Sequence, residues 1–143
     1  NMNRLLTCCF RLPTHAPKFN DAFVTTTKQS ARVVKVYDGD SITIVLPFRY
    51  KYFEFKTRLV GIDTPELRTR NEKEKQMGYQ AKEFLKQLVD QKTIQVECQG
   101  MDKYGRLLIV PYINGRNVCE LMVEKGWAKR YDGGTKEKWN FDV

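Results

Sequence analysis

The sequence predicts a mainly β domain with helices (α+β), built as a five-stranded OB-fold barrel that carries two main α-helices. Short β-branched segments with alternating apolar residues recur between turn residues, which is typical of small barrels. One long amphipathic helix interrupts them and a second helix follows the last strand, in the order β-β-β-α-β-β-α. The chain of 143 residues is long enough for one such domain with its own core.

The first three strands are expected between residues 31 and 60. Alternating valines lead to an Asp38-Gly39 turn, and a β-branched run follows at hairpin spacing. Pro47 is expected to close that second strand, which makes the connection from Pro47 to Lys51 longer than usual. Residues 52–60 alternate as the third strand.

The first helix is expected over residues 77–89, after a charged loop at residues 67–75. Apolar residues at helical spacing form one stripe along it: Met77, Ala81, Phe84, Leu85, Leu88 and Val89. Alternating residues at 93–98 and 106–113 predict the fourth and fifth strands.

The second helix has clear start and stop signals. Asn117 is a candidate N-cap with Glu120 three residues later, which is the pattern of a capping box. Gly126 stands where a glycine commonly ends a helix. These signals predict a short helix between Asn117 and Gly126.

Residues 1–30 are expected to form an N-terminal extension, and residues 31–143 the barrel domain. The extension holds an apolar cluster that Arg11 interrupts, too short and too broken for a convincing signal peptide. Three interpretations stay open: a targeting segment, a membrane anchor through acylation of the adjacent Cys8 and Cys9, or a segment packed on the barrel. No apolar run is long enough to cross a bilayer, and the compartment stays undetermined.

The composition favours a polyanionic partner and argues against several catalytic classes. Lysine and arginine number 25 against 17 acidic residues, a net charge of +8, which favours nucleic acid or an anionic membrane surface. His15 is the only histidine, which argues against a Ser-His-Asp triad or a histidine metal cluster, and no P-loop motif is present. Cys98 and Cys119 lie in apolar patterns and are expected to be buried free thiols, which favours a reducing compartment.

The residues suited to catalysis lie at the ends of the predicted strands, next to turns. Asp40 and Asp63 could be brought together by adjacent strands, and two carboxylates with backbone oxygens suit Ca²⁺. Arg58 and Arg106 could each direct a guanidinium fork at phosphate oxygens. Glu66 follows a proline in a constrained turn and could act as a general base toward water.

Each of these residues, taken alone, also has a purely structural interpretation. Aspartates at turns commonly bond local backbone N–H groups, and arginines at a rim form salt bridges. Other basic and tyrosine residues could line a nucleic-acid groove or simply be solvated: Lys103, Tyr104, Lys129, Arg130 and Tyr131.

Taken together and in their order, these segments resemble the thermonuclease (staphylococcal nuclease) family. The resemblance covers roughly residues 31 to 131 and rests on D-G-D-S, R-L-V-G-I-D-T-P-E, G-Y-Q-A and D-K-Y-G-R, followed by N-V-C-E-L-M-V-E-K-G-W-A. It implies an OB-fold enzyme that uses Ca²⁺ to hydrolyse single- and double-stranded DNA and RNA with low sequence specificity. Cleavage at the 5′ P–O bond would leave 3′-phosphate ends.

The resemblance also implies a role for each matching residue. Asp40, Asp63 and the backbone carbonyl of Thr64 match the calcium ligands. Arg58, Glu66 and Arg106 match the catalytic residues, and Lys103 and Tyr104 match residues beside the nucleotide. Lys129 and Tyr131 are added as further nucleic-acid contacts, and we expect a monomer.

Two other functional classes stay open. The first is a catalytically weak or inactive OB-fold nucleic-acid-binding module, like the degenerate nuclease repeats of Tudor-nuclease proteins. Such repeats typically lose several of the catalytic residues, whereas this chain keeps Asp40, Arg58, Asp63, Glu66 and Arg106. The second is a protein-interaction scaffold, which no specific feature supports.

The sequence departs from the family pattern in ways that affect these expectations. Ser41 stands where threonine is commoner, and the acids Glu72 and Glu74 lie in the charged loop. The family's third, C-terminal helix is truncated after Tyr131, and residues 136–141 resemble only its tail. We hypothesise that apolar residues of the N-terminal extension cover the barrel surface left bare: Leu5, Leu6, Phe10 and Leu12.

Overall fold

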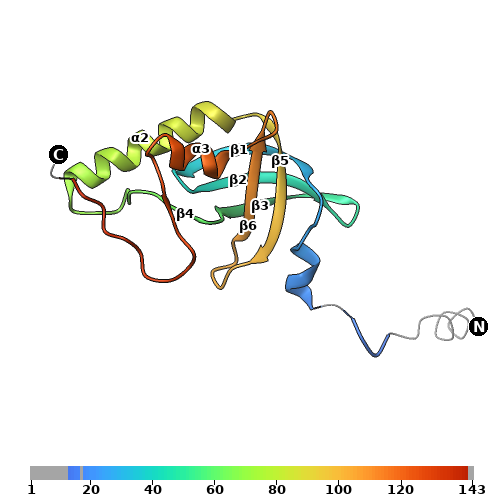
Figure 1. Ribbon diagram of the computed structural model, residues 1–143. Helices are drawn as coiled ribbons and strands as arrows, with labels where there is room; N and C mark the ends of the chain where they lie inside the picture. Colours follow the sequence, from blue (N-terminus) through green and yellow to red (C-terminus); the bar gives the residue numbers. More distant parts are fainter. Residues whose placement is uncertain (1–12, 17, 142–143) are drawn as a thin grey trace, which may run out of the picture.

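Five strands form a closed barrel in the computed structural model, which describes residues 13–16 and 18–141 (Figure 1). The barrel strands are β1 (Gln29–Asp38), β2 (Ser41–Phe48), β3 (Lys51–Leu59), β5 (Thr93–Met101) and β6 (Leu107–Ile113). Short strands are β4 (Ile62–Asp63), β7 (Arg116–Asn117) and β8 (Lys129–Arg130). The helices are η1 (Phe19–Phe23), α2 (Glu72–Val89) and α3 (Val118–Glu124). The predicted OB-type α+β architecture is confirmed.

The barrel closes through a parallel pairing between its two end strands. The sheet runs in the order β3-β2-β1-β5-β6, and β3 pairs with β6 from Thr57↔Leu107 to Leu59↔Ile109. Alternate residues of β2, β5 and β6 point inward, whereas β3 is buried only at Thr57 and Leu59, near its end. The inward set is almost fully buried, at 0% exposure for Val33, Ile44 and Val96. Helix α2 adds Ala81, Leu85 and Val89 to this core and lies along β1.

Helix α2 begins earlier than the sequence predicts. Its N-cap is Asn71, whose side chain accepts hydrogen bonds from the backbone N–H groups of Lys73 and Glu74 at 3.0 and 3.2 Å. The expectation that residues 72–75 belong to a loop is therefore wrong. The first turn is exposed and charged, so the apolar stripe could not show it, and acidic side chains there are favoured by the helix dipole.

The β2–β3 connection is shorter than the sequence predicts, because the strands are longer. Pro47 lies inside β2 and pairs with Tyr52, and only Arg49 and Tyr50 form the turn, with φ of 49° and 69°. Positive φ at both central residues is the geometry of a tight hairpin turn. Proline is tolerated here because β1 pairs with β2 only as far as Val45, so this end of β2 is an edge.

Helix α3 begins at its predicted cap, whereas the segment after β8 is irregular. Asn117 caps α3 as predicted, accepting a hydrogen bond from the Glu120 backbone N–H at 3.2 Å. Residues 131–141 form no helix and run as an irregular strap from β8 towards the start of α2 (Figure 1). On the N-terminal side, Phe23 is buried and stacks on Phe48. The apolar residues proposed to cover the barrel lie outside the described residues.

Two further properties bear on location and partners. Cys98 and Cys119 are buried free cysteines, as predicted, and burial raises the pKa of Cys119 to about 12. Among the described residues, no helix has the length and apolar character needed to span a bilayer.

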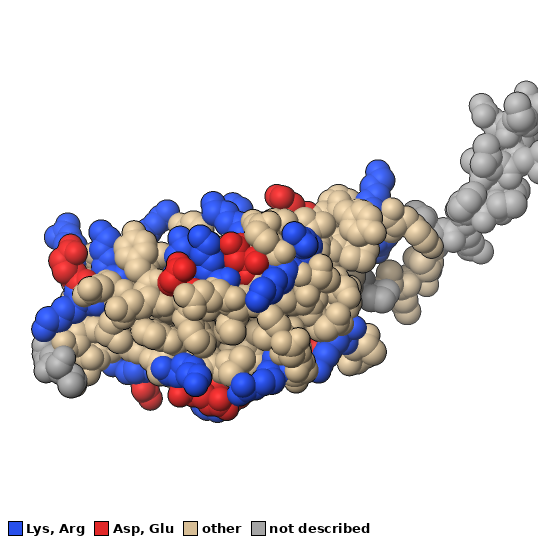
Figure 2. Space-filling model, turned by 90° about the horizontal axis from the view of Figure 1, so that it is seen from above, with Lys and Arg blue, Asp and Glu red and all other residues tan. Residues whose placement is uncertain are grey.

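Figure 2 shows basic side chains along both long edges of one face, with acidic ones among them and a mainly uncharged centre. The site of a polyanion therefore has to be found from local geometry.

Candidate active site

The first corner of the site is built around Asp40 and Arg58. The β1–β2 turn is held by Asp38, whose carboxylate accepts a hydrogen bond from the Asp40 backbone N–H at 3.1 Å. Asp40 Oδ2 lies 3.0 Å from Arg58 Nη1, and these side chains are only 12% and 13% exposed. The guanidinium also donates to the backbone carbonyls of Leu59 and Ile62, at 3.0 and 2.9 Å. Arg58 is thus locked in place before any ligand binds.

The predicted calcium ligands meet at the same corner. The Thr64 backbone N–H donates to Asp40 Oδ2 at 3.3 Å, which brings Asp63 and Thr64 to the β1–β2 turn. Strand β4 positions Asp63 by pairing with Lys129 of β8. Gly39 suits this close packing, because a Cβ there would lie only 3.0 Å from the Thr64 side chain.

A lysine that the sequence analysis did not single out completes this corner. Lys136, on the strap, places Nζ 2.9 Å from Asp63 Oδ1 and 3.5 Å from Glu66 Oε1. Asp63, and to a smaller extent Glu66, raise the pKa of Lys136 above its usual value. No local pattern predicts this contact, since Lys136 lies far from both carboxylates in the sequence.

Glu66 is positioned by the start of helix α2. Its backbone N–H donates to the Glu74 carboxylate at 3.3 Å, and its own side chain is 57% exposed. Gly78 allows the helix to approach closely, because a Cβ there would lie 2.8 Å from the Pro65 carbonyl oxygen. A glycine inside a helix is normally unfavourable, so this packing explains its place in the G-Y-Q-A segment.

Arg106 lies apart from the Asp40–Arg58 corner, on a separate flank of the site at the β5–β6 turn. Asp102 holds its guanidinium at 2.7 Å and accepts hydrogen bonds from the backbone N–H groups of Tyr104 and Arg106. Burial opposes ionisation of Asp102, but these hydrogen bonds hold its pKa below the usual value. Tyr104 is 72% exposed, with the Lys103 and Arg106 cations 5.2 and 5.6 Å from its ring centroid.

A small cleft lies between Arg106 and the two sides of the β1–β2 turn. It has a volume of about 320 Å³, and Asp38, Lys56 and Arg106 are among its lining residues. Burial, and next the neighbouring Asp40 carboxylate, raise the pKa of Asp38 to about 6. Asp38 is predicted only as a turn former, whereas in the structure it also lines this cleft together with Arg106.

The last two predicted nucleic-acid contacts, Lys129 just before the strap and Tyr131 at its start, both bond to the strap backbone. Lys129 Nζ donates to the Lys138 carbonyl at 2.7 Å and lies 4.8 Å from the centroid of the Trp139 ring. The Tyr131 hydroxyl donates to the Gly134 carbonyl at 3.0 Å. The structure therefore gathers Lys129 and Tyr131 near Asp63, while Lys103 and Tyr104 lie on the Arg106 flank.

The donor atoms at the first corner fit a hard cation. Within the described residues, no group of three or more His, Cys, Asp or Glu side chains is arranged to hold a metal. However, Asp63 Oδ1 is buried and accepts no hydrogen bond of regular geometry from a described residue. Two carboxylates, the Thr64 carbonyl and water would form the all-oxygen ligand set that Ca²⁺ prefers. The Lys136 ammonium shows that this oxygen already faces a positive charge.

The closed OB-type barrel thus carries aspartates, a glutamate and an arginine beside the β1–β2 turn, and a second arginine at the β5–β6 turn. This combination of fold and side chains is that of a nuclease-like protein. The profile of the family described as staphylococcal nuclease homologue matches residues 56–141. The chain therefore belongs to this family, and the predicted resemblance is confirmed.

Three relatives are similar to about 70% of this chain. The chain is 36% identical over 104 residues to an uncharacterized endonuclease of Haemophilus influenzae, covering 73% of this chain and 53% of that protein. An uncharacterized endonuclease of Escherichia coli O157:H7 is 36% identical over 102 residues, covering 71% and 60%. An uncharacterized protein of Methanocaldococcus jannaschii is 32% identical over 124 residues, covering 70% and 58%. The chain thus spans little more than half the length of these relatives.

Proposed function

We propose that this chain is a Ca²⁺-dependent nuclease that hydrolyses single- and double-stranded DNA and RNA with low sequence specificity. It would cut the 5′ P–O bond and leave 3′-phosphate ends. The observation that carries the proposal is the convergence of Asp40, Arg58, Asp63 and Thr64 in one corner of a barrel of the staphylococcal nuclease family. The endonuclease names of two relatives support the same activity.

Each residue has a distinct task in this mechanism. Asp40, Asp63 and the Thr64 carbonyl would hold Ca²⁺, which when bound would neutralise charge on the phosphoryl oxygens. Arg58 and Arg106 would stabilise the charge that develops on those oxygens. Both guanidinium groups are already oriented by a carboxylate, which lowers the cost of organising the site.

Glu66 would act as the general base, because its exposed carboxylate lies near Asp63, one of the proposed calcium ligands. It would take one proton from the attacking water, whose oxygen then bonds to phosphorus. The bond from phosphorus to the 5′ oxygen breaks, and that oxygen takes a proton from solvent. The products are a 3′-phosphate and a 5′-hydroxyl.

A second function is favoured by one observation. The Lys136 ammonium already pairs with Asp63 and Glu66, and both Lys129 and Tyr131 donate hydrogen bonds to backbone carbonyls of the strap. A chain that keeps this arrangement would bind nucleic acid without cutting it.

The test is digestion of single-stranded DNA, duplex DNA and RNA, with Ca²⁺ and with a chelator. We expect cleavage that the chelator abolishes and that Glu66→Gln strongly reduces. Glu72→Gln is the matched control, because Glu72 is exposed in the first turn of α2 and has no part in the site. Salt-sensitive binding without cleavage would support the binding module instead.

A further inference from the structure

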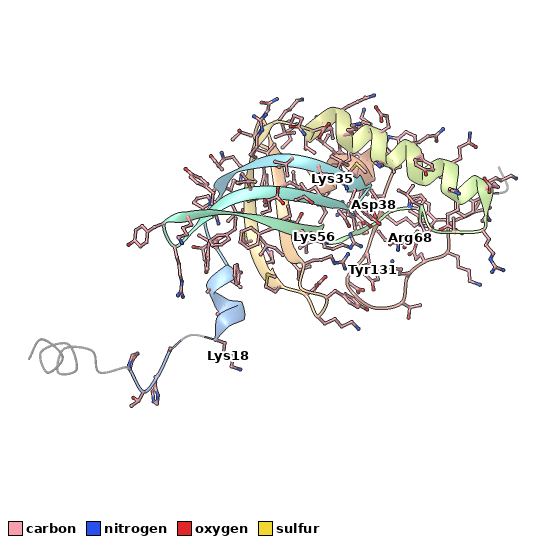
Figure 3. All side chains as sticks on the ribbon, turned by 180° about the vertical axis from the view of Figure 1, so that it is seen from behind. Lys18, Lys35, Asp38, Lys56, Arg68 and Tyr131 are labelled. Atoms are coloured by element: carbon pink, nitrogen blue, oxygen red, sulfur yellow. The ribbon has the colours of Figure 1, made fainter. Side chains whose placement is uncertain are left out.

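A second, larger cavity opens beside the proposed active site. It has a volume of about 800 Å³ and lies between β1, residues 66–70 and helix α2. Asp38 and Glu66 form part of its wall, so it adjoins the proposed catalytic residues. It shares Lys35, Tyr37 and Asp38 with the small cleft that reaches Arg106. Figure 3 shows Lys35, Lys56 and Arg68 around Asp38, and the shared lining residues make the two cavities neighbours.

The charge of this cavity favours an anionic ligand. Five basic side chains line it against the two acids Asp38 and Glu66: Lys35, Arg68, Arg70, Lys75 and Lys82. None of these five takes part in an ion pair with a described residue. Arg58 and Arg106, in contrast, are each held by a carboxylate. The cavity therefore keeps positive charge that phosphate groups could neutralise.

Two exposed tyrosines distinguish this cavity from a merely basic surface. Tyr37 and Tyr79 are 46% and 53% exposed and lie on β1 and α2. The Tyr37 hydroxyl accepts a hydrogen bond from Arg68 at 3.0 Å, which ties β1 to the loop before α2. Lys35 Nζ lies 5.9 Å from the centroid of the same ring. Aromatic rings beside unpaired cations are what single-stranded nucleic acid needs, since bases stack and phosphates pair with charge.

We propose that the cavity formed by Lys35, Tyr37, Arg68 and Tyr79 is a subsite for a single nucleic-acid strand beyond the scissile phosphate, on the side away from Tyr104. This inference rests on the proposed function, because it extends the path of the strand that the nuclease would cut. The strand would run from Arg106 through the small cleft, past Asp38 and Glu66, into this cavity. Paired bases in a duplex cannot stack on these tyrosines, so the subsite favours single strands over the duplexes that the enzyme would also cut.

The test measures binding of a fluorescent single-stranded oligothymidylate of about 12 nucleotides, in the presence of a chelator so that no cleavage occurs. The double variant Lys35→Gln/Arg68→Gln removes two cavity charges. Lys51→Gln/Lys125→Gln is the control, because it removes the same charge from exposed positions outside the cavity. We expect the cavity variant to raise Kd about tenfold or more and to lower the salt dependence, with a much smaller change in the control.

Tyr37→Leu and Tyr79→Leu test the stacking part of the proposal. We expect each to raise the Kd of the single strand about five- to tenfold and to leave duplex binding nearly unchanged. Equal losses in the cavity and control variants, or equal losses for duplex and single strand, would overturn the proposal. Circular dichroism confirms that each variant is folded.

This assay separates the subsite from the proposed nuclease activity. If the wild type cuts nothing but the cavity variants lose single-strand binding, the subsite stands and the nuclease function fails. If the wild type cuts DNA and the cavity variants bind and cut like the wild type, the subsite is wrong and the nuclease function stands.

Discussion

The two halves of the proposed active site are built in different ways. In the Asp40–Arg58 half, both side chains are nearly buried, and the guanidinium bonds to Asp40 and to the backbone carbonyls of Leu59 and Ile62. In the Asp63–Glu66 half, Glu66 is 57% exposed and the positive partner is Lys136, itself 47% exposed, on the strap. The Asp40–Arg58 half is thus held by the barrel and by the short strand β4 beside it. The Asp63–Glu66 half includes an ammonium from the strap.

The largest expected effect is the loss of both stability and activity when Arg58 is removed from the Asp40–Arg58 half. Arg58→Ala leaves the Asp40 carboxylate without its ionic partner, so we expect a loss of about 3 kcal/mol in the free energy of unfolding. We expect kcat to fall by roughly 100-fold or more as well. Urea unfolding and steady-state cleavage measure the two effects. Arg58→Lys keeps the charge without the fork, so a variant with full activity would contradict the assigned role.

Removal of Glu66 should affect chemistry but not stability. Glu66→Gln is expected to lower kcat by roughly 100-fold or more, because water loses its proton acceptor. The side chain is exposed, so the melting temperature should change little. Cleavage rates and thermal unfolding of the same sample test this contrast with Arg58→Ala. A large fall in melting temperature with unchanged kcat would reverse the interpretation.

Gly78→Ala tests how the helix positions the Asp63–Glu66 half. Alanine is favoured over glycine in a helix by about 1 kcal/mol, yet here its Cβ would meet the Pro65 carbonyl at 2.8 Å. The backbone that carries Glu66 must therefore move, and we expect kcat to fall about tenfold with no gain in stability. Gln76→Ala, at an exposed helix position, is the control that should keep full activity.

The smallest effect is expected at Lys136. Lys136→Met removes the ammonium that competes for Asp63, so Ca²⁺ should bind about three- to tenfold more tightly by calorimetry. Ca²⁺ should also change the fluorescence of Trp139 in the wild type, because this residue lies on the same strap. Lys138→Met serves as a control with an exposed side chain. Weaker Ca²⁺ binding in Lys136→Met would show that the lysine supports the site instead.

Local patterns in the sequence determined the order of strands and helices, the cap at Asn117 and the buried cysteines. Apolar periodicity and capping chemistry act over a few residues, so they can be read without tertiary structure. The candidate residues Asp40, Arg58 and Asp63 were also found from the sequence, because they end strands in an order typical of one family. Their roles in catalysis remain predictions.

Other features were decided only by tertiary structure. The first turn of α2 is exposed, so no apolar stripe marks its start at Glu72, and Pro47 enters β2 only because β1 stops pairing at Val45. Lys136 reaches Asp63, and Arg68 reaches Tyr37, across large separations in the sequence. Such contacts depend on how the closed barrel, the loop before α2 and the strap come together. Residue spacing therefore cannot reveal them, and the cavity beside the proposed active site follows from the same packing.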